Sequence, residues 1–159
     1  MDTLDIRPAT PSDVELLLQL IHELALAEQF PFDVTANETD LRNSLFGPKP
    51  AAEAVIAECE SEVAGFAVFY ETFATTTARR GLHLDDLFIR PAFQGKGLGR
   101  KLFEHIGHIA HARECARFEW WSLRTNTKAI AFYDALGARP MEELLVFRTQ
   151  GSFLANFTK

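Results

Sequence analysis

Three glycines fall within five residues of the stretch PAFQGKGLGRKLF, at positions 91–103, directly before a helix-like pattern. Because Gly costs backbone entropy, the grouping of Gly95, Gly97 and Gly99 requires a local reason. The first turn of a helix presents N–H groups without intrahelical partners and carries partial positive charge, and together these bind phosphate. The bases that follow, beginning at Arg100, add positive charge. The stretch therefore predicts a diphosphate-binding loop rather than a plain flexible turn.

Two other phosphate-binding loops can be compared with this spacing. A Walker loop requires GxxxxGK[ST], which the chain does not contain. A dinucleotide-binding GxGxxG loop fits Gly95 and Gly97, but the third glycine falls at position 99 and Arg stands at position 100. That loop is also usually the first strand-to-helix turn of its unit, whereas this one lies past the middle of the chain. A dinucleotide-binding domain remains an alternative.

The elements around the loop must be able to position it. A strand-like run, LHLDDLFIR at residues 82–90, ends at Pro91 and leads into the glycines. A helix then begins near Gly97 or Leu98, because apolar residues recur at helical spacing on one face. These residues are Leu98, Leu102, Ile106, Ile109 and Ala110.

The rest of the chain alternates between strand-like and helix-like patterns. Ser12 and Glu15 resemble a capping box for a helix that Pro11 opens, and Gly137 is suited to end a later helix. The expected strands are residues 4–10, 54–58, 63–70, 117–123 and 143–149, and the other expected helices are residues 12–25, 37–46 and 126–137. This order predicts a single domain of residues 1–159 in the α/β (α+β) class, with a mixed sheet.

Composition excludes several classes of protein. The net charge of -6 argues against a nucleic-acid partner, and no apolar run reaches the roughly 18 residues of a membrane span. The first residues lack a basic-then-apolar signal pattern, so we expect a cytoplasmic protein. Cys59 and Cys115 stand far apart without a CxxC motif, which predicts reduced thiols. His105, His108 and His111 drift around a helix, so we expect no metal site.

The spacing from Gln94 to Gly99 resembles the [RQ]xxGxG/A acetyl-CoA loop of the GNAT superfamily of N-acetyltransferases. The later segment NTKAIAFYDALGARP resembles the family pattern N-x-x-A-x-x-F-Y-x-x-x-G-A. The stretches LIHELALAE and HLDDLFIRPAFQGKGLGRKL resemble the diamine branch, the spermidine/spermine and thialysine N-acetyltransferases, and the likeness runs over about residues 5–150. It implies a GNAT-like, mostly antiparallel central sheet of about six to seven strands, flanked by about four helices.

The resemblance implies acetyl-CoA as the cofactor and assigns residues to it. The pantetheine arm is expected along the strand, and the diphosphate at the glycine loop. Asn126 is expected to contact the cofactor as well, and it is equally suited to cap its helix. The implied cofactor-binding residues are Leu87, Phe88, Ile89, Gln94, Gly95, Lys96, Gly97, Leu98, Gly99, Arg100, Asn126 and Lys128.

The resemblance also implies catalytic roles. Tyr133 matches the tyrosine that protonates the departing thiolate in this family, and a phenol of pKa near 10 suits that role. Asp85 matches a family glutamate and is expected to relay the proton of the amine, through water because Asp is the shorter side chain. Asp86 is expected on the opposite side of the strand, to bind substrate charge or to make a structural bond. Two solvated acids at a strand end are the alternative reading.

The implied amine site is acidic. Glu28 matches an acid of the amine pocket in the diamine enzymes, and Glu119, Trp120 and Trp121 are expected to border the same pocket. The alternative is that one Trp packs in the core instead. Arg124 stands where that branch often carries Asp, which favours a smaller amine or an amino acid whose carboxylate pairs with Arg124.

We therefore expect an acetyl-CoA-dependent N-acetyltransferase that acts by direct attack on a primary amine of a small diamine, polyamine or lysine-like substrate. Related enzymes imply a homodimer. A CoA-binding regulatory module without turnover is the main alternative.

Overall fold

The computed structural model describes residues 3–157, and the chain forms two compact units divided between Trp121 and Ser122. The first unit holds a five-stranded sheet with the strand order β1-β2-β3-β4-β5. Neighbouring strands are antiparallel from β1 to β4, whereas β4 and β5 are parallel. The strands are β1 (Leu4–Pro8), β2 (Glu53–Cys59), β3 (Glu62–Ala74), β4 (Arg79–Ile89) and β5 (Phe118–Trp120).

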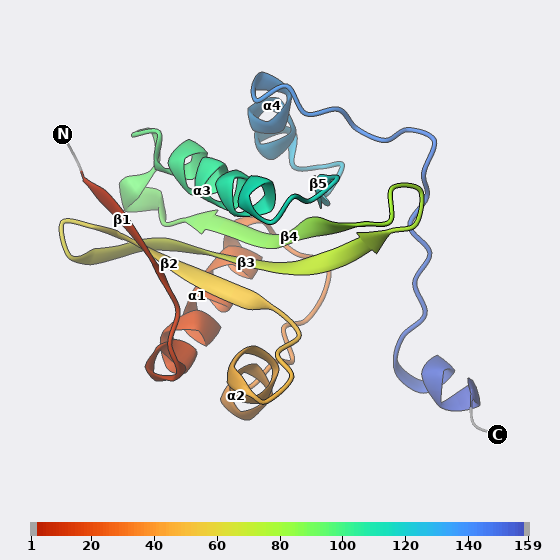
Figure 1. Ribbon diagram of the computed structural model, residues 1–159. Coiled ribbons are helices and arrows are strands. Elements are labelled where there is room, and N and C mark those ends of the chain that lie inside the picture. Colours follow the sequence, from red (N-terminus) through yellow and green to blue (C-terminus); the bar gives the residue numbers. More distant parts are fainter. Residues whose placement is uncertain (1–2, 158–159) are drawn as a thin grey trace. The chain divides into compact units, whose positions relative to one another are not determined.

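Helices cover both faces of this sheet (Figure 1). The helix α3 (Leu98–Ala112) lies on one face, and α1 (Val14–Ala27) and α2 (Glu38–Phe46) lie on the other. Two short 3-10 helices complete the first unit, η1 (Pro11–Asp13) and η2 (Pro91–Phe93). The expected mixed α/β fold with a mostly antiparallel sheet is thereby confirmed.

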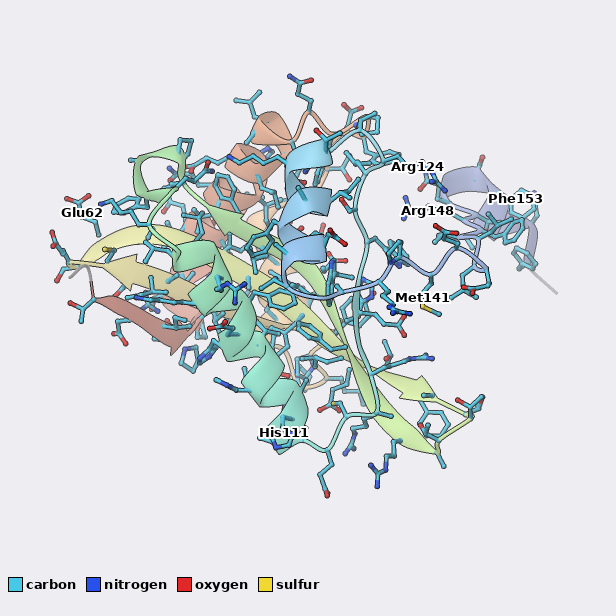
Figure 2. All side chains as sticks on the ribbon, turned by 90° about the horizontal axis from the view of Figure 1, so that it is seen from above. Glu62, His111, Arg124, Met141, Arg148 and Phe153 are labelled. Atoms are coloured by element: carbon cyan, nitrogen blue, oxygen red, sulfur yellow. The ribbon has the colours of Figure 1, made fainter. Side chains whose placement is uncertain are left out.

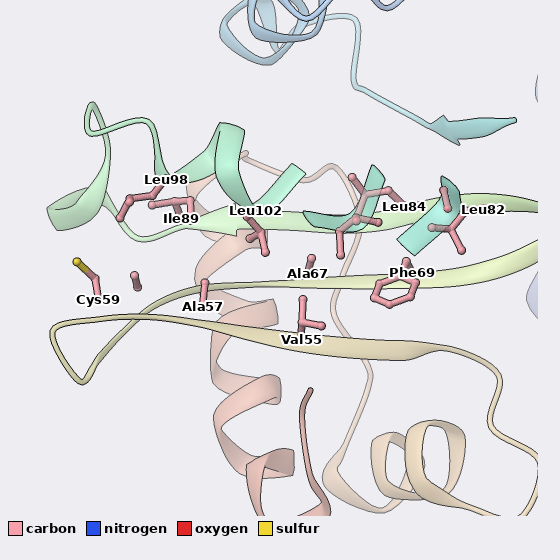
Figure 3. Packing of buried hydrophobic residues seen from close by; sticks show 13 residues of the cluster. Val55, Ala57, Cys59, Ala67, Phe69, Leu82, Leu84, Ile89, Leu98 and Leu102 are labelled. Atoms are coloured by element: carbon pink, nitrogen blue, oxygen red, sulfur yellow. The ribbon is translucent and has the colours of Figure 1, made fainter. Parts of the chain in front are cut away.

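Each face of the sheet has its own apolar core. On the α3 side, alternate strand residues pack against one stripe of that helix (Figure 3), and they include Val55, Ala67, Phe69, Leu82, Leu84, Leu98, Leu102 and Ile106. On the α1 side the buried residues include Leu17, Leu20, Leu24, Ile56, Phe66 and Phe88. Burial of side chains of this size stabilises the fold by about 1.5–3 kcal/mol each. The two cores fix which residues of β4 face which helix.

The turns agree with the local sequence. The hairpin between β2 and β3 turns on Glu60 and Ser61, with φ of 51° and 69°, so both central residues are left-handed as a tight hairpin requires. Asn37, at which we expected this helix to begin, caps α2 by accepting the amide of Asp40 at 2.9 Å. The expected capping box of Ser12 is wrong.

The capping box lies two residues earlier in the chain, between Thr10 and Asp13. The Asp13 carboxylate accepts the Thr10 amide at 2.7 Å and pairs with Arg7 at 2.8 Å. The Arg7 hydrogen bond is the main cause that lowers the pKa of Asp13 to about 2.

The second unit contains α4 (Thr127–Ala135) and the short 3-10 helix η3 (Gly151–Phe157). Gly137 follows α4 with a φ of 84°, the left-handed residue predicted to end it. The expected strand at residues 143–149 is wrong, because the segment pairs with no strand of the described chain. Its run from Leu144 to Phe147 is 61–90% exposed. Figure 2 labels Met141 before this segment, Arg148 within it and Phe153 in η3.

The described strands therefore number five, not six or seven, whereas the predicted four α-helices are present. Among residues 3–157, none of the helices combines the length and the apolar character that a membrane crossing demands.

Candidate functional site

The glycine loop joins the end of β4 to the start of α3 and takes a left-handed conformation twice. Gly95 has a φ of 77° and Gly97 a φ of 76°. A Cβ built on either residue would meet no heavy atom within 4 Å. These glycines are therefore required by backbone conformation, which costs other residues roughly 1–2 kcal/mol, and not by crowding. The space beside them is open to a ligand.

The first amides of α3 have no hydrogen-bond partner within the helix. Gly97 is the N-cap residue, and no side chain of the described chain caps the helix there. The first N–H bonded within the helix is that of Lys101, which donates to the Gly97 carbonyl at 3.1 Å. The amides of Leu98, Gly99 and Arg100 precede that bond, so they lie at the positive end of the helix dipole. This arrangement suits a phosphate group.

Side chains around the loop divide into those that fix it and those that add charge. Gln94 Nε2 donates to the Ile89 carbonyl at 2.8 Å, so Gln94 ties the loop to the end of β4. The expected contact of Gln94 with the diphosphate stays a prediction. Lys96 is exposed, and Arg100 lies 3.4 Å from Glu104 in an exposed pair.

The end of β4 is also held against α1. Arg90 donates to both carboxylate oxygens of Glu23, at 2.8 and 2.9 Å, and to the Val63 carbonyl at 3.1 Å. The Arg90 hydrogen bond is the main cause that lowers the pKa of Glu23. Such bidentate pairs are geometrically specific, so the entry of the chain into the loop is fixed.

A β-bulge lies in β4 just before residues Leu87–Ile89. Val68 of β3 pairs with Asp86, but the next residue, Phe69, pairs with Leu84, so Asp85 has no opposite residue. The bulge shifts the alternation of side chains by one residue. Asp86 therefore shares the α1 face with its partner Val68, and the simple alternation on which we separated the two aspartates is interrupted.

The strands β4 and β5 diverge at this bulge. Their parallel pairing covers three residue pairs and ends with Leu84 opposite Trp120. Beyond it, the outer edge of β4 has no strand partner in the described chain. The side chains of Leu87 and Ile89 pack on the α3 side and that of Phe88 on the α1 side. No described strand pairs with the outer edge of these residues, and the predicted contact of their backbone with a pantetheine arm stays a prediction.

Three carboxylates interact where β4 passes the end of α1. Burial is the main cause that raises the pKa of Asp86 to about 7, and the negative charges of Asp85 and Glu28 raise it further. Burial also raises the pKa of Glu28, which is half-buried just after α1. Asp85 is exposed. The structure therefore brings together the predicted Glu28, Asp85 and Asp86, and we call these three residues the acidic cluster.

Three aromatic side chains adjoin the acidic cluster, and of these we expected only Trp121 near the amine pocket. His83 is only 6% exposed, its ring stacks on Tyr70 at 4.9 Å, and Trp121 meets it edge-on at 5.1 Å. Burial lowers the pKa of His83, against the opposing charges of Asp85 and Glu119. A signal existed in the sequence, because His83 precedes Asp85 by two residues, which places both on one face of a strand.

The side chains of Glu119 and Trp120 lie on opposite faces of the sheet at β5. Glu119 pairs with His83 in the sheet and bonds Arg117 at 2.7 Å, so it lies on the face of the acidic cluster. Trp120 pairs with Leu84 and packs among Phe103 and the α3 core. The expectation that Trp120 borders the amine pocket is therefore not supported, because strand alternation turns it to the opposite face.

The second unit holds the remaining predicted residues. Asn126 caps α4, since its Oδ1 accepts the Ala129 amide at 3.1 Å. Lys128 is exposed in the first turn of α4. Tyr133 is half-buried, with its ring 5.4 Å from that of Phe132. The roles of these residues toward a cofactor stay predictions.

Comparison with known proteins agrees with this geometry. The Acetyltransferase (GNAT) family matches residues 18–138. The thialysine N-epsilon-acetyltransferase of Caenorhabditis elegans is 32% identical, and the match covers 99% of this chain and 98% of the relative. The L-ornithine N5-acetyltransferase NATA1 of Arabidopsis thaliana is 25% identical over 97% of this chain and 87% of the relative.

Among solved structures, an integron cassette protein from the mobile metagenome of V. cholerae superposes with a TM-score of 0.77. It is 28% identical, and the superposition covers 96% of each chain. The match therefore extends over nearly the whole fold.

Proposed function

The chain belongs to the GNAT acetyltransferase family, and we propose that it transfers acetyl from acetyl-CoA to a primary amine of a small diamine, polyamine or lysine-like substrate. The main support is that the chain runs from the acidic cluster on β4 through the glycine loop to the N-terminus of α3, which has no side-chain cap among the described residues. A cation-attracting site and an anion-binding site thus lie on one strand and the loop that follows it. The first site suits the positive charge of an amine, and the second suits the negative charge of a nucleotide diphosphate.

The donor is held by the chain as follows. The amides of Leu98, Gly99 and Arg100 bind the diphosphate, and the outer edge of Leu87–Ile89 binds the pantetheine arm. Lys96 contributes positive charge, and Asn126 and Lys128 contact the cofactor from the start of α4. Bound acetyl-CoA supplies an acetyl group already activated as a thioester, so the chain needs no covalent nucleophile.

The amine must lose a proton before it attacks, because its ammonium form has a pKa near 10. Asp85 is exposed and accepts this proton through water. Asp86, whose pKa is raised to about 7, carries a charge that varies around neutral pH. Rising pH therefore strengthens the attraction of the acidic cluster for an ammonium group. Tyr133 protonates the leaving sulfur.

The substrate class follows from charge. Glu28 and Asp86 attract a distal ammonium, whereas Arg124 favours a substrate carboxylate. The relatives named for thialysine and L-ornithine support an amino acid with a terminal amine. We therefore favour lysine-like amino acids over polyamines as the substrate.

Amine acetylation is tested by a screen of the purified protein with acetyl-CoA. The amines are thialysine, lysine, ornithine, putrescine and spermidine, and the readouts are thiol release and product mass. Acetylation of the amino acids supports the proposal. Binding of acetyl-CoA without turnover of any amine would favour the regulatory module instead, and stabilisation by NAD but not by acetyl-CoA would favour a dinucleotide-binding domain.

A cytoplasmic homodimer completes the proposal. The exposed run from Leu144 to Phe147 is the kind of apolar surface that a second copy covers. Light scattering on the purified protein measures the assembly, and a monomer at all concentrations would remove this part.

A further inference from the structure

One buried titratable group beside the acidic cluster has no part in the mechanism above. His83 lies on β4 two residues before Asp85, and it pairs with Tyr70 of β3 and Glu119 of β5. Tyr70 and Trp121 enclose the imidazole on two sides, at 4.9 and 5.1 Å between ring centroids. The side chain is thus held in one orientation on the face that carries the acidic cluster.

Within the described part of the chain, no polar group bonds the ring nitrogens of His83. No hydrogen bond found among residues 3–157 involves them, although the residue is 6% exposed. No fully buried polar side-chain atom of the described residues lacks a partner, so these nitrogens keep contact with solvent. An ordered imidazole that reaches water beside a carboxylate is suited to exchange protons with it.

The charges around His83 come from three strands. Asp85 on β4 and Glu119 on β5 raise the pKa of His83, and burial lowers it by more. Tyr70 on β3 is neutral at physiological pH, since burial and the charge of Asp85 raise its pKa. Glu119 is itself paired with Arg117 at 2.7 Å. His83 is therefore unprotonated at neutral pH and has a lone pair to accept a proton.

We propose that His83 acts through Asp85 as a positioning residue. His83 takes up the proton that the amine loses, and Asp85 passes this proton to it. This inference rests on the proposed function. The ammonium nitrogen keeps the electron pair of its N–H bond, which becomes the attacking lone pair. The proton passes through water to a carboxylate oxygen of Asp85, and from there through water to a ring nitrogen of His83. The imidazolium then returns the proton to solvent.

His83→Phe tests this role, because it keeps a ring against Tyr70 but removes both nitrogens. His83→Gln is a second variant that stays polar and takes up no proton, and His108→Gln is the matched control on an exposed part of α3. We expect kcat to fall about 10–100-fold in both His83 variants, with the amine KM within about twofold. The acidic limb of the kcat–pH profile changes in these variants and not in the control.

A titration by NMR tests the coupling of His83 to Asp85 without turnover. The protein has five histidines, and the spectrum of His83→Gln identifies the His83 signal. We expect the pKa of His83 to fall in Asp85→Asn, since a negative neighbour has been removed. An unchanged titration, or His83 variants with wild-type kcat and pH profile, would overturn the inference. A wild-type protein that acetylates no amine refutes the proposed function instead, and the titration then decides the coupling alone.

Discussion

Replacement of Asp86 by Asn should make the protein more stable at alkaline pH and leave its stability unchanged in acid. The pKa of Asp86 is raised from 3.8 to about 7, mainly by burial and further by Asp85 and Glu28. The folded protein therefore binds this proton more tightly than the unfolded chain does. Between those two pKa values the unfolded chain holds fewer protons, so stability falls as pH rises.

The magnitude follows from the two pKa values. The interval from 3.8 to about 7 corresponds to at most about 4 kcal/mol at 1.36 kcal/mol per pH unit, and water that reaches the half-buried carboxyl reduces it. Asn has nearly the same shape and no charge, so Asp86→Asn avoids this cost. The variant should exceed wild type by about 2–4 kcal/mol near pH 8, and the difference should vanish near pH 4.

Urea unfolding followed by circular dichroism across this pH range measures the effect. Asp5→Asn on β1 is the matched control, because it removes an exposed carboxylate outside the acidic cluster. Differences between variants cancel the contributions of other acids, such as Glu23 and Glu53, whose lowered pKa values act in the opposite direction. A gap between Asp86→Asn and wild type that is the same at both pH extremes would refute the reasoning.

Three further substitutions have defined outcomes. Tyr133→Phe should lower kcat by about 10²–10⁴-fold and leave acetyl-CoA affinity nearly unchanged in calorimetry; unchanged turnover would remove the acid role. Gly97→Ala should cost about 1 kcal/mol in urea unfolding because of its φ of 76°, and should weaken acetyl-CoA at least tenfold; undiminished affinity would mean that the loop does not contact the diphosphate. Asp85→Asn should flatten the rise of rate with pH, and a profile identical to wild type counts against the relay.

The loop and its helix could be predicted from sequence because their causes are local. Glycines at left-handed positions, an apolar stripe at helical spacing and a proline after a strand act over a few residues. The start of α3 at Leu98 and the N-cap of α2 at Asn37 follow from such signals. The two strands expected at residues 54–58 and 63–70 correspond to β2 and to the first part of β3.

Features that depend on pairing between distant segments could not be predicted. The bulge at Asp85 exists only because Val68 and Phe69 of β3 skip that residue, and no local pattern in β4 marks it. Trp120 faces the α3 core because β5 pairs in register with Leu84. The segment from residue 143 to 149 has the composition of a strand, but a strand also requires a partner.

The contacts of Tyr70 and Trp121 with His83 also depend on pairing between distant segments, so they could not be predicted from sequence. Each residue is ordinary in its own segment, and the three meet only when β3, β4 and β5 align. Sequence reasoning found the acids of the site through their resemblance to a family, and it found no partner for His83.

The most direct test of the account observes the backbone amides of Leu98, Gly99 and Arg100 by ¹⁵N NMR during titration with acetyl-CoA, with NAD as the comparison. We expect saturable shifts of these three amides with acetyl-CoA and not with NAD, since the uncapped N-terminus of α3 binds the diphosphate of the acetyl donor. If acetyl-CoA binds and these amide signals do not move, the diphosphate lies elsewhere and the account is contradicted.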